Sequence, residues 1–230
     1  FSLRPSDRKR MAQADLFYWI GPDLEVFLQS LTRQYPNSSV ELQSLPNLHL
    51  LYYADHQEHE HSHDGHDHAH HEHDHHHLPG ALDSHLWLST HNAKVIAERI
   101  AADLSRLDSA HAQHYQDNLA AFNQRLNSLA QEINQQLSPL RENSFFVFHE
   151  AFNYYEEEFG LQHGGILAIS GDVQPGARHL QDMRQRLEQA GTTCILTEPP
   201  APPKLAYSLS KDLPIHLQEA DVLGTRASSY

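Results

Sequence analysis

The sequence predicts an α/β fold: two lobes with parallel sheets flanked by helices, joined by one long linker helix. Its 230 residues are enough for one large domain or two modest ones. In the C-terminal part, short apolar runs alternate with helical patterns, which is typical of parallel strands covered on both sides. The middle of the chain carries one helical pattern of about 40 Å, long enough to act as a strut between two lobes.

The N-terminal lobe is predicted to span residues 1–108. Compact apolar runs indicate buried strands, and residues such as Pro22 and Ser89 mark where helices begin. Residues 52–80 lack the apolar content needed to fold, so we expect a disordered loop within this lobe. The expected elements are a helix at 4–13, a strand at 14–20, a helix at 22–34, a strand at 40–45 and a helix after Ser89.

The linker helix is predicted at residues 109–138. Apolar side chains recur there at spacings of three and four residues, which is the pattern of a helix with one apolar face. The residues that form this face are Tyr115, Leu119, Phe122, Leu126, Leu129, Ile133 and Leu137.

The C-terminal lobe is predicted to span residues 139–230. Ligands of parallel α/β sheets lie beyond the carboxyl ends of the strands, so residues at those ends are the first candidates for a site. Gly160 and Gly191 are expected to end helices. The expected strands lie at 144–148, 165–170, 193–198 and 214–217, with helices at 150–160 and 174–191.

Charge and composition narrow the possible partners. The formal net charge of −14 argues against nucleic acid, which is bound by basic surfaces, and suits a protein that meets cations. No apolar run approaches the roughly 18 residues that indicate a bilayer-spanning helix. The single Cys194 lies in the apolar run TTCILT, which favours a buried small hydrophobe over a functional thiol. We expect a monomer.

Residues 56–77 contain twelve histidines, interleaved with carboxylates. Imidazole is a good ligand for zinc, copper and nickel, so metal binding is favoured over a solvated spacer without a role. Ordering such a loop costs entropy, and we therefore expect several weak, overlapping sites. Two formal HExxH matches, at His59 and His71, follow from the density of histidine and have no helical pattern to support a protease. The accessory metal loop comprises His56, His59, His61, His63, His66, His68, His70, His71, His73, His75, His76 and His77.

Three residues outside this loop are candidate metal ligands. His149 follows the apolar strand at 144–148 directly, and His85 precedes a helix. Asp221 stands at a strand-to-loop transition, although aspartate is common in turns for conformational reasons alone. No GxSxG, P-loop or dinucleotide glycine motif is present, so the sequence does not indicate an enzyme.

The motifs taken in order carry a resemblance to a known family. They are FSLRPSD, ADLFYWIGPDLEVFL, the acidic histidine-rich loop, SHLWLS, a long helix, FFVFHEAFNYYEEEFGL, VQPGARHLQDMRQRL, CILTEP and DVLGT. Together they resemble the periplasmic high-affinity zinc-uptake binding proteins of the ZnuA type, which are the substrate-binding components of metal ABC transporters. The resemblance covers essentially the whole chain.

The resemblance implies a zinc site in a cleft between two lobes. His85 matches the family's second metal histidine and His149 the third, where manganese-type relatives carry glutamate. Histidine at that position also favours zinc by its ligand chemistry. Asp221 matches an aspartate that ligates metal in some relatives, but Val222 replaces the usual proline beside it. Glu198 matches an acidic residue of the cleft that supports the ligands from behind.

The resemblance also implies where the chain works and what surrounds it. It implies periplasmic capture of Zn²⁺ and its delivery to a membrane ABC permease, with the histidine-rich loop gathering or sensing metal. It implies a chain truncated at both ends, with a first metal histidine two residues before Phe1. Cys194 matches a cysteine that pairs in some relatives with one near the C-terminus. The alternatives are a zinc storage or buffering protein and a zinc-dependent hydrolase, with Glu150 as the neighbouring base.

Overall fold

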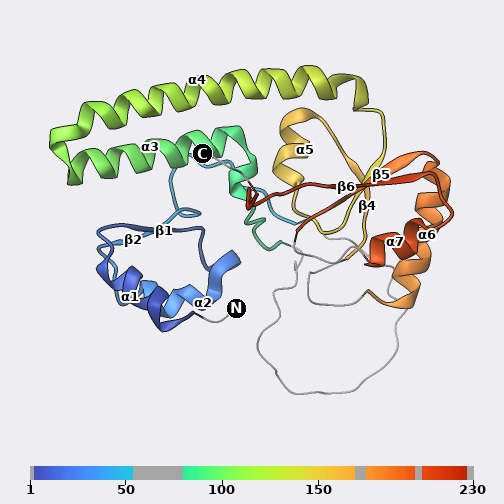
Figure 1. Cartoon of the computed structure of the whole chain (residues 1–230), viewed down its shortest axis with the longest axis horizontal. Coiled ribbons are helices and arrows are strands. Elements are labelled where there is room, and N and C mark those ends of the chain that lie inside the picture. Colours follow the sequence, from blue (N-terminus) through green and yellow to red (C-terminus); the bar gives the residue numbers. More distant parts are fainter. Residues whose placement is uncertain (1–2, 54–79, 169–174, 200–203, 227–230) are drawn as a thin grey trace. The chain divides into compact units, whose positions relative to one another are not determined.

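The computed structural model describes residues 3–53, 80–168, 175–199 and 204–226. It confirms the α/β class, with parallel sheets flanked by helices (Figure 1). The chain divides into two compact units, and the helix predicted as a linker belongs to the first of them by its contacts. The first unit comprises Phe1–Leu51 and Leu82–Ser138, and the second comprises Tyr52–Ala81 and Pro139–Tyr230.

The first unit is built on a small parallel sheet covered by helices on both faces. Trp19 packs with Met11 and Leu28 on one face, while Val40 packs toward Ile96 on the other, so alternate residues of the strands feed two apolar clusters. The elements are α1 (Pro5–Gln13), β1 (Phe17–Trp19), α2 (Pro22–Thr32), β2 (Ser39–Glu41), α3 (Thr90–Leu107) and α4 (Ala112–Leu137).

Two long helices, α3 and α4, lie side by side in this unit (Figure 1). Ser89 caps α3 as predicted, because its hydroxyl accepts a hydrogen bond from the Asn92 backbone N at 3.3 Å. The predicted second helix begins with a 3₁₀ turn, Ser109–His111, before α4. None of the residues of α4 is fully buried, so this helix packs through one half-buried apolar stripe.

The second unit holds a four-stranded parallel sheet of order β4-β3-β5-β6. Its core consists of Phe146 and Ile195 from the sheet packed against Met183 and Leu187 of α6 and Leu209 of α7. Gly160 ends α5 with φ 68°, in the left-handed conformation that glycine adopts without strain. The elements are β3 (Phe145–Val147), α5 (Asn153–Phe159), β4 (His163–Ile166), α6 (Ala177–Ala190), β5 (Thr193–Thr197), α7 (Lys204–Ser210) and β6 (Ile215–Glu219).

Two elements of the second unit differ from the prediction. Strand β4 begins at His163, two residues earlier than expected, because Gly164 and Gly165 hide the apolar pattern of a strand. Glycine is needed there: a Cβ at Gly165 would lie 3.0 Å from Sδ of Met183 on α6. Helix α7 was not predicted, since seven residues are too few to show a period. Arg184 supports it by donating to the Leu209 carbonyl at 2.8 Å.

The predicted loop 52–80 is too long at its N-terminal end. Tyr53 is only 5% exposed, and its backbone N donates to the Ala81 carbonyl at 2.9 Å. Asp83 N donates to the Leu51 carbonyl at 2.9 Å, so residues 51–53 and 81–83 form a short antiparallel bridge. A buried aromatic residue and this pairing order the chain where polarity alone predicted disorder. Residues 54–79 lie outside the described residues.

Cys194 is half-buried on β5 rather than buried as predicted, because it lies on the opposite face from the fully buried Ile195. Burial still raises the pKa of its thiol above the ordinary value. Across the part of the chain that the structure describes, no helix combines the length and apolar character required to cross a membrane.

Candidate metal centre

His85 lies in the first unit, immediately before a 3₁₀ turn that leads into α3. Its side chain is held by Asp83, which is fully buried. The Nδ1 atom of His85 lies 2.7 Å from Asp83 Oδ1, and the His85 backbone N donates to the same oxygen at 3.0 Å. Leu86, also fully buried, anchors the turn behind the imidazole. The orientation of His85 is therefore fixed by its own local chain.

This contact determines which nitrogen of His85 suits a metal. A carboxylate at Nδ1 favours the tautomer that carries its proton there, and this tautomer leaves the lone pair on Nε2. Histidines that ligate metals are held in this way, with the second nitrogen donating to a carboxylate or carbonyl. The Asp83–His85 pair therefore has the chemistry of a zinc ligand and its support.

His149 lies in the second unit, at the carboxyl end of β3. Strands β3 and β5 pair in parallel with Val147 opposite Leu196, so the same register brings His149 beside Glu198. Nδ1 of His149 contacts Oε2 of Glu198, which is 7% exposed. The His149 side chain remains 23% exposed. The sheet thus presents a partly accessible imidazole backed by a buried carboxylate.

The second carboxylate oxygen of Glu198, Oε1, also favours a cation beside His149. Oε1 is buried and has no hydrogen-bond partner among the described residues. A buried carboxylate without its full set of partners is costly, and its charge is best compensated by a cationic neighbour. A metal ion on His149 would supply positive charge at this place. His85 and His149 therefore show the same arrangement, one in each unit.

Asp221 follows β6, beyond Ala220, whose N donates to the Thr197 carbonyl at 2.8 Å. Its carboxylate accepts hydrogen bonds from the Arg226 backbone N at 2.8 Å and from Thr225 Oγ1 at 3.0 Å. Desolvation acts to raise the pKa of Asp221, but these hydrogen bonds outweigh it and the pKa lies below the ordinary value. The carboxylate of Asp221 already accepts hydrogen bonds within its own turn, so Asp221 is a weaker candidate ligand than the two histidines.

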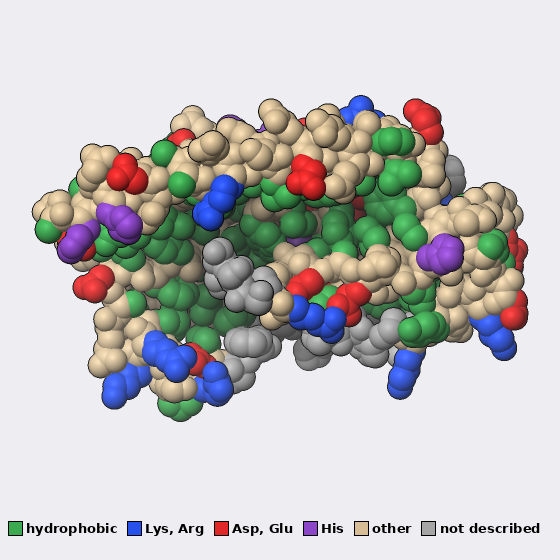
Figure 2. Space-filling model, turned by 45° about the horizontal axis from the view of Figure 1, so that its top comes forward, with side chains coloured by type: hydrophobic (Ala, Val, Ile, Leu, Met, Phe, Trp, Pro, Cys, Tyr) green, Lys and Arg blue, Asp and Glu red, His purple; other side chains and the backbone are tan. Residues whose placement is uncertain are grey.

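The twelve histidines of the accessory metal loop lie outside the described residues. Within the ranges that the structure does describe, no group of three or more histidine, cysteine, aspartate or glutamate residues is arranged to hold a metal ion. On the face drawn in Figure 2, acidic side chains are scattered rather than gathered in a patch. The candidate ligands His85 and His149 thus lie in different units, each beside one buried carboxylate.

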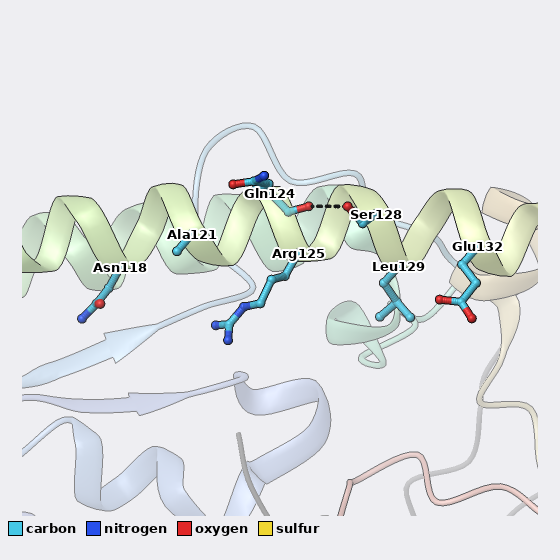
Figure 3. A pocket seen from close by; sticks show the side chains of 7 residues that line it. All are labelled: Asn118, Ala121, Gln124, Arg125, Ser128, Leu129 and Glu132. Carbon is cyan, nitrogen blue, oxygen red and sulfur yellow. Dashed lines mark hydrogen bonds between the residues drawn. The ribbon is translucent and has the colours of Figure 1, made fainter.

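A hollow of about 660 Å³ runs along α4 but contains none of the candidate ligands (Figure 3). Its side chains come from successive turns of that helix, with Arg125 and Glu132 as the charged groups. Ser128 Oγ bonds the Gln124 carbonyl at 3.2 Å, which is a local helix contact. The lining holds no histidine, cysteine or aspartate, so this hollow is not the metal centre.

Asp83 is a residue of the candidate site that the sequence prediction missed. It stands two positions before His85 in LDSHLWL, a spacing at which a turn can bring a carboxylate onto the imidazole of the histidine. That spacing was the available signal. Glu198, in contrast, was expected to support the ligands from behind, and its contact with His149 agrees with such a role.

Another histidine–carboxylate pair of the second unit lies at the amino end of β4. Nδ1 of His163, the first residue of β4, is 2.8 Å from Oε1 and 3.0 Å from Oε2 of Glu156, which is 6% exposed. The His163 backbone N donates to the same carboxylate at 3.1 Å. This pair fastens α5 to β4 and has a structural role.

Replacing His163 with glutamine is expected to destabilise the protein more in acid than in alkali. Burial lowers the pKa of His163, but the hydrogen bond and charge of Glu156, with the charge of Glu150, raise it above 6.5. A raised pKa in the folded state stabilises the protein fully below the unfolded pKa and loses that effect as pH rises through the folded pKa. Urea unfolding at about pH 6 and about pH 9 measures the difference. An equal loss at both pH values would contradict it, and His216→Gln, an exposed histidine, is the control.

The described residues thus form two α/β units, with His85 beside the buried Asp83 in the first and His149 beside the buried Glu198 in the second. Comparison with known proteins gives the family. The chain belongs to the ZnuA family, zinc-uptake complex component A, periplasmic, whose model matches residues 1–230. Members are solute-binding proteins of zinc ABC transport rather than enzymes, so the hydrolase alternative is set aside.

Curated relatives and solved structures agree with this family. The chain is 34% identical to the high-affinity zinc uptake system protein ZnuA of Brucella abortus (strain 2308), over 91% of this chain and 69% of the relative. It is 33% identical to ZnuA of Yersinia pestis, over 98% and 72%. A crystal structure of ZnuA shares the fold with TM-score 0.78 and 22% identity, over 97% and 77% of the two chains. AdcAII of Streptococcus pneumoniae gives TM-score 0.73 and 25% identity, over 97% and 76%.

Proposed function

We propose that the chain binds Zn²⁺ through Nε2 of His85 and Nε2 of His149, in the cleft between its lobes, and delivers the ion to a membrane ABC permease. The observation that carries this proposal is that a carboxylate holds Nδ1 of both rings. Zinc binds imidazole at about 2.0–2.1 Å in tetrahedral sites, and each ring so oriented offers the nitrogen that zinc needs.

Two imidazoles fill half of a tetrahedral zinc site. The remaining positions would be taken by a further histidine and by water or a carboxylate. Glu198 is engaged with His149 and is better suited to support than to ligation. Asp221 stays a weaker candidate, because its turn must give up hydrogen bonds from Thr225 and Arg226 before it can ligate.

Drawing ligands from two units supports a delivery role. Each unit contributes too few groups to hold zinc tightly alone, so affinity depends on both being in place. A small displacement of one unit on docking would lengthen metal–ligand distances and weaken the site. This is the behaviour that a carrier needs, because it must bind tightly in solution and release the ion at a permease. In the proposed order of events, the protein therefore first captures zinc and then docks at the permease in the periplasm.

The histidine-rich loop is proposed as an accessory segment that gathers zinc near the site or senses high zinc. Its twelve histidines and interleaved carboxylates attract cations, and it ends eight residues before His85 in the sequence. Copper and nickel are expected to bind it as well, because imidazole suits all three metals. Storage or buffering is the competing function, in which this segment would be the main site.

Deleting residues 56–77 distinguishes zinc delivery from zinc storage or buffering. We expect the full-length protein without this segment to keep one tight zinc site and to lose only the weak additional ones. Competition titration against a chelator of known affinity measures both classes of site. Loss of the tight site together with the segment would contradict the proposed ligands and favour storage. Unchanged zinc uptake by the deleted protein under severe zinc limitation would count against the gathering role.

A further inference from the structure

Residues 51–53 and 81–83, here called the stem, form an antiparallel bridge on either side of the histidine-rich segment in the sequence. Three hydrogen bonds of 2.9 Å form it: Tyr53 N to the Ala81 carbonyl, Gly80 N to the Tyr53 carbonyl, and Asp83 N to the Leu51 carbonyl. One side of the stem continues through Asp83, the carboxylate that orients His85. The stem therefore includes a residue that supports one proposed ligand.

Tyr53 belongs to the second unit, which also holds the other proposed ligand, His149. Its side chain is 5% exposed, and its hydroxyl donates to the Glu150 carbonyl at 3.5 Å. Glu150 follows His149 directly, and both lie in the bend after β3. Tyr52, its neighbour in the chain, is 60% exposed because successive residues of a strand face opposite sides. Of these two adjacent tyrosines, Tyr53 is therefore the one that contacts the bend after β3.

The bend that carries His149 has an irregular backbone, so its shape depends on specific contacts. Phe148 N donates to the Leu196 carbonyl at 2.8 Å, which fixes the entry to the bend. Asn153 donates to the Glu150 side chain at 3.3 Å, which fixes the exit. The Tyr53 hydroxyl contacts the Glu150 carbonyl between them. A buried phenol hydroxyl is costly unless it is bonded, so this contact favours one position of both groups.

We propose that Tyr53 is a positioning residue for the zinc site, which sets the place of His149 by bonding the adjacent Glu150 carbonyl. The inference rests on His149 being a zinc ligand, as proposed above. Tyr53 lies at the base of the histidine-rich segment, yet it acts on the ordered site and not through the histidines of that segment. Phenylalanine would pack equally well in its place but would leave the carbonyl without this donor.

The test compares Tyr53→Phe with Tyr52→Phe in the full-length protein. We expect Tyr53→Phe to lower zinc affinity roughly tenfold, the lower end of the effect of removing groups that support metal ligands. Tyr52→Phe should leave the affinity unchanged. Cobalt(II) bound in place of zinc reports ligand geometry through its visible absorption bands. These bands should shift in Tyr53→Phe and match the unsubstituted protein in Tyr52→Phe.

Three outcomes would overturn the proposal or its basis separately. Unchanged affinity and unchanged cobalt bands in Tyr53→Phe would overturn the positioning role. Lower affinity with unchanged bands and a lower melting temperature of the zinc-free protein would also overturn it, because the residue would then act on stability alone. His149→Ala is measured alongside. Full affinity in that variant would overturn the proposed ligand instead, so the two failures are distinguishable.

Discussion

Replacing His149 with alanine is expected to lower zinc affinity more than about 100-fold. Removing groups that merely support metal ligands costs 10–100-fold, so removing the ligand itself should cost more. The substitution also leaves Glu198, which is 7% exposed, without its cationic or hydrogen-bonded neighbour. Competition titration of the full-length protein against a zinc chelator measures the change.

The matched control for His149 is His216. It lies in the same unit, on β6, and its side chain is exposed. His216→Ala should retain the zinc affinity of the unsubstituted protein. This result would show that removing a histidine elsewhere in the unit does not lower zinc affinity. Equal affinities in His149→Ala and His216→Ala would remove His149 from the site.

The second large effect is expected at a residue that does not touch the metal. Asp83→Asn should lower zinc affinity about 10–100-fold. Asparagine keeps the shape of the side chain but loses its charge, so no carboxylate lies at the 2.7 Å from Nδ1 of His85 that Asp83 Oδ1 occupies. The ring then loses its preference for the tautomer with a lone pair on Nε2. The same titration measures this loss.

Asp15 provides the control for Asp83. It belongs to the same unit but is exposed, so Asp15→Asn changes the net charge equally and should leave zinc affinity unchanged. Far-ultraviolet circular dichroism confirms that Asp83→Asn is folded. A folded Asp83→Asn protein with full affinity would show that Asp83 holds the turn and does not tune the ligand.

The position of His149 was predictable because strand ends follow from local sequence. Four apolar residues indicate β3, and the end of such a strand is where parallel sheets place ligands. Glu198, which follows β5 directly, was expected from the family resemblance. The contact between His149 and Glu198 was not predictable, because it depends on β3 and β5 being neighbours. That pairing is a property of the whole sheet.

Asp83 and Tyr53 were missed for a different reason. Each acts through a contact that depends on backbone geometry, a turn at His85 and the pairing of residues 51–53 with 81–83. Composition around Tyr53 is dominated by the polar segment that follows, so a buried aromatic side chain was hidden at its edge. Low complexity predicts disorder on average and does not show where it begins.

Asp221 shows the opposite case, in which a motif suggested more than the local geometry supports. Its carboxylate bonds Thr225 and Arg226 within its own turn, which is the conformational role that aspartate commonly takes. The motif fixed its place after β6 correctly. What the carboxylate does there is decided by partners that lie only four and five residues away.

The central claim is that zinc is held by Nε2 of His85 and Nε2 of His149. Nitrogen-15 NMR of the imidazole rings, with equimolar zinc added to the full-length protein, tests it most directly. We predict that both rings keep the proton on Nδ1 and that both Nε2 signals shift on metal binding, before any signal of the histidine-rich segment changes. Shifts confined to that segment at equimolar zinc, with both rings unchanged, would contradict the claim.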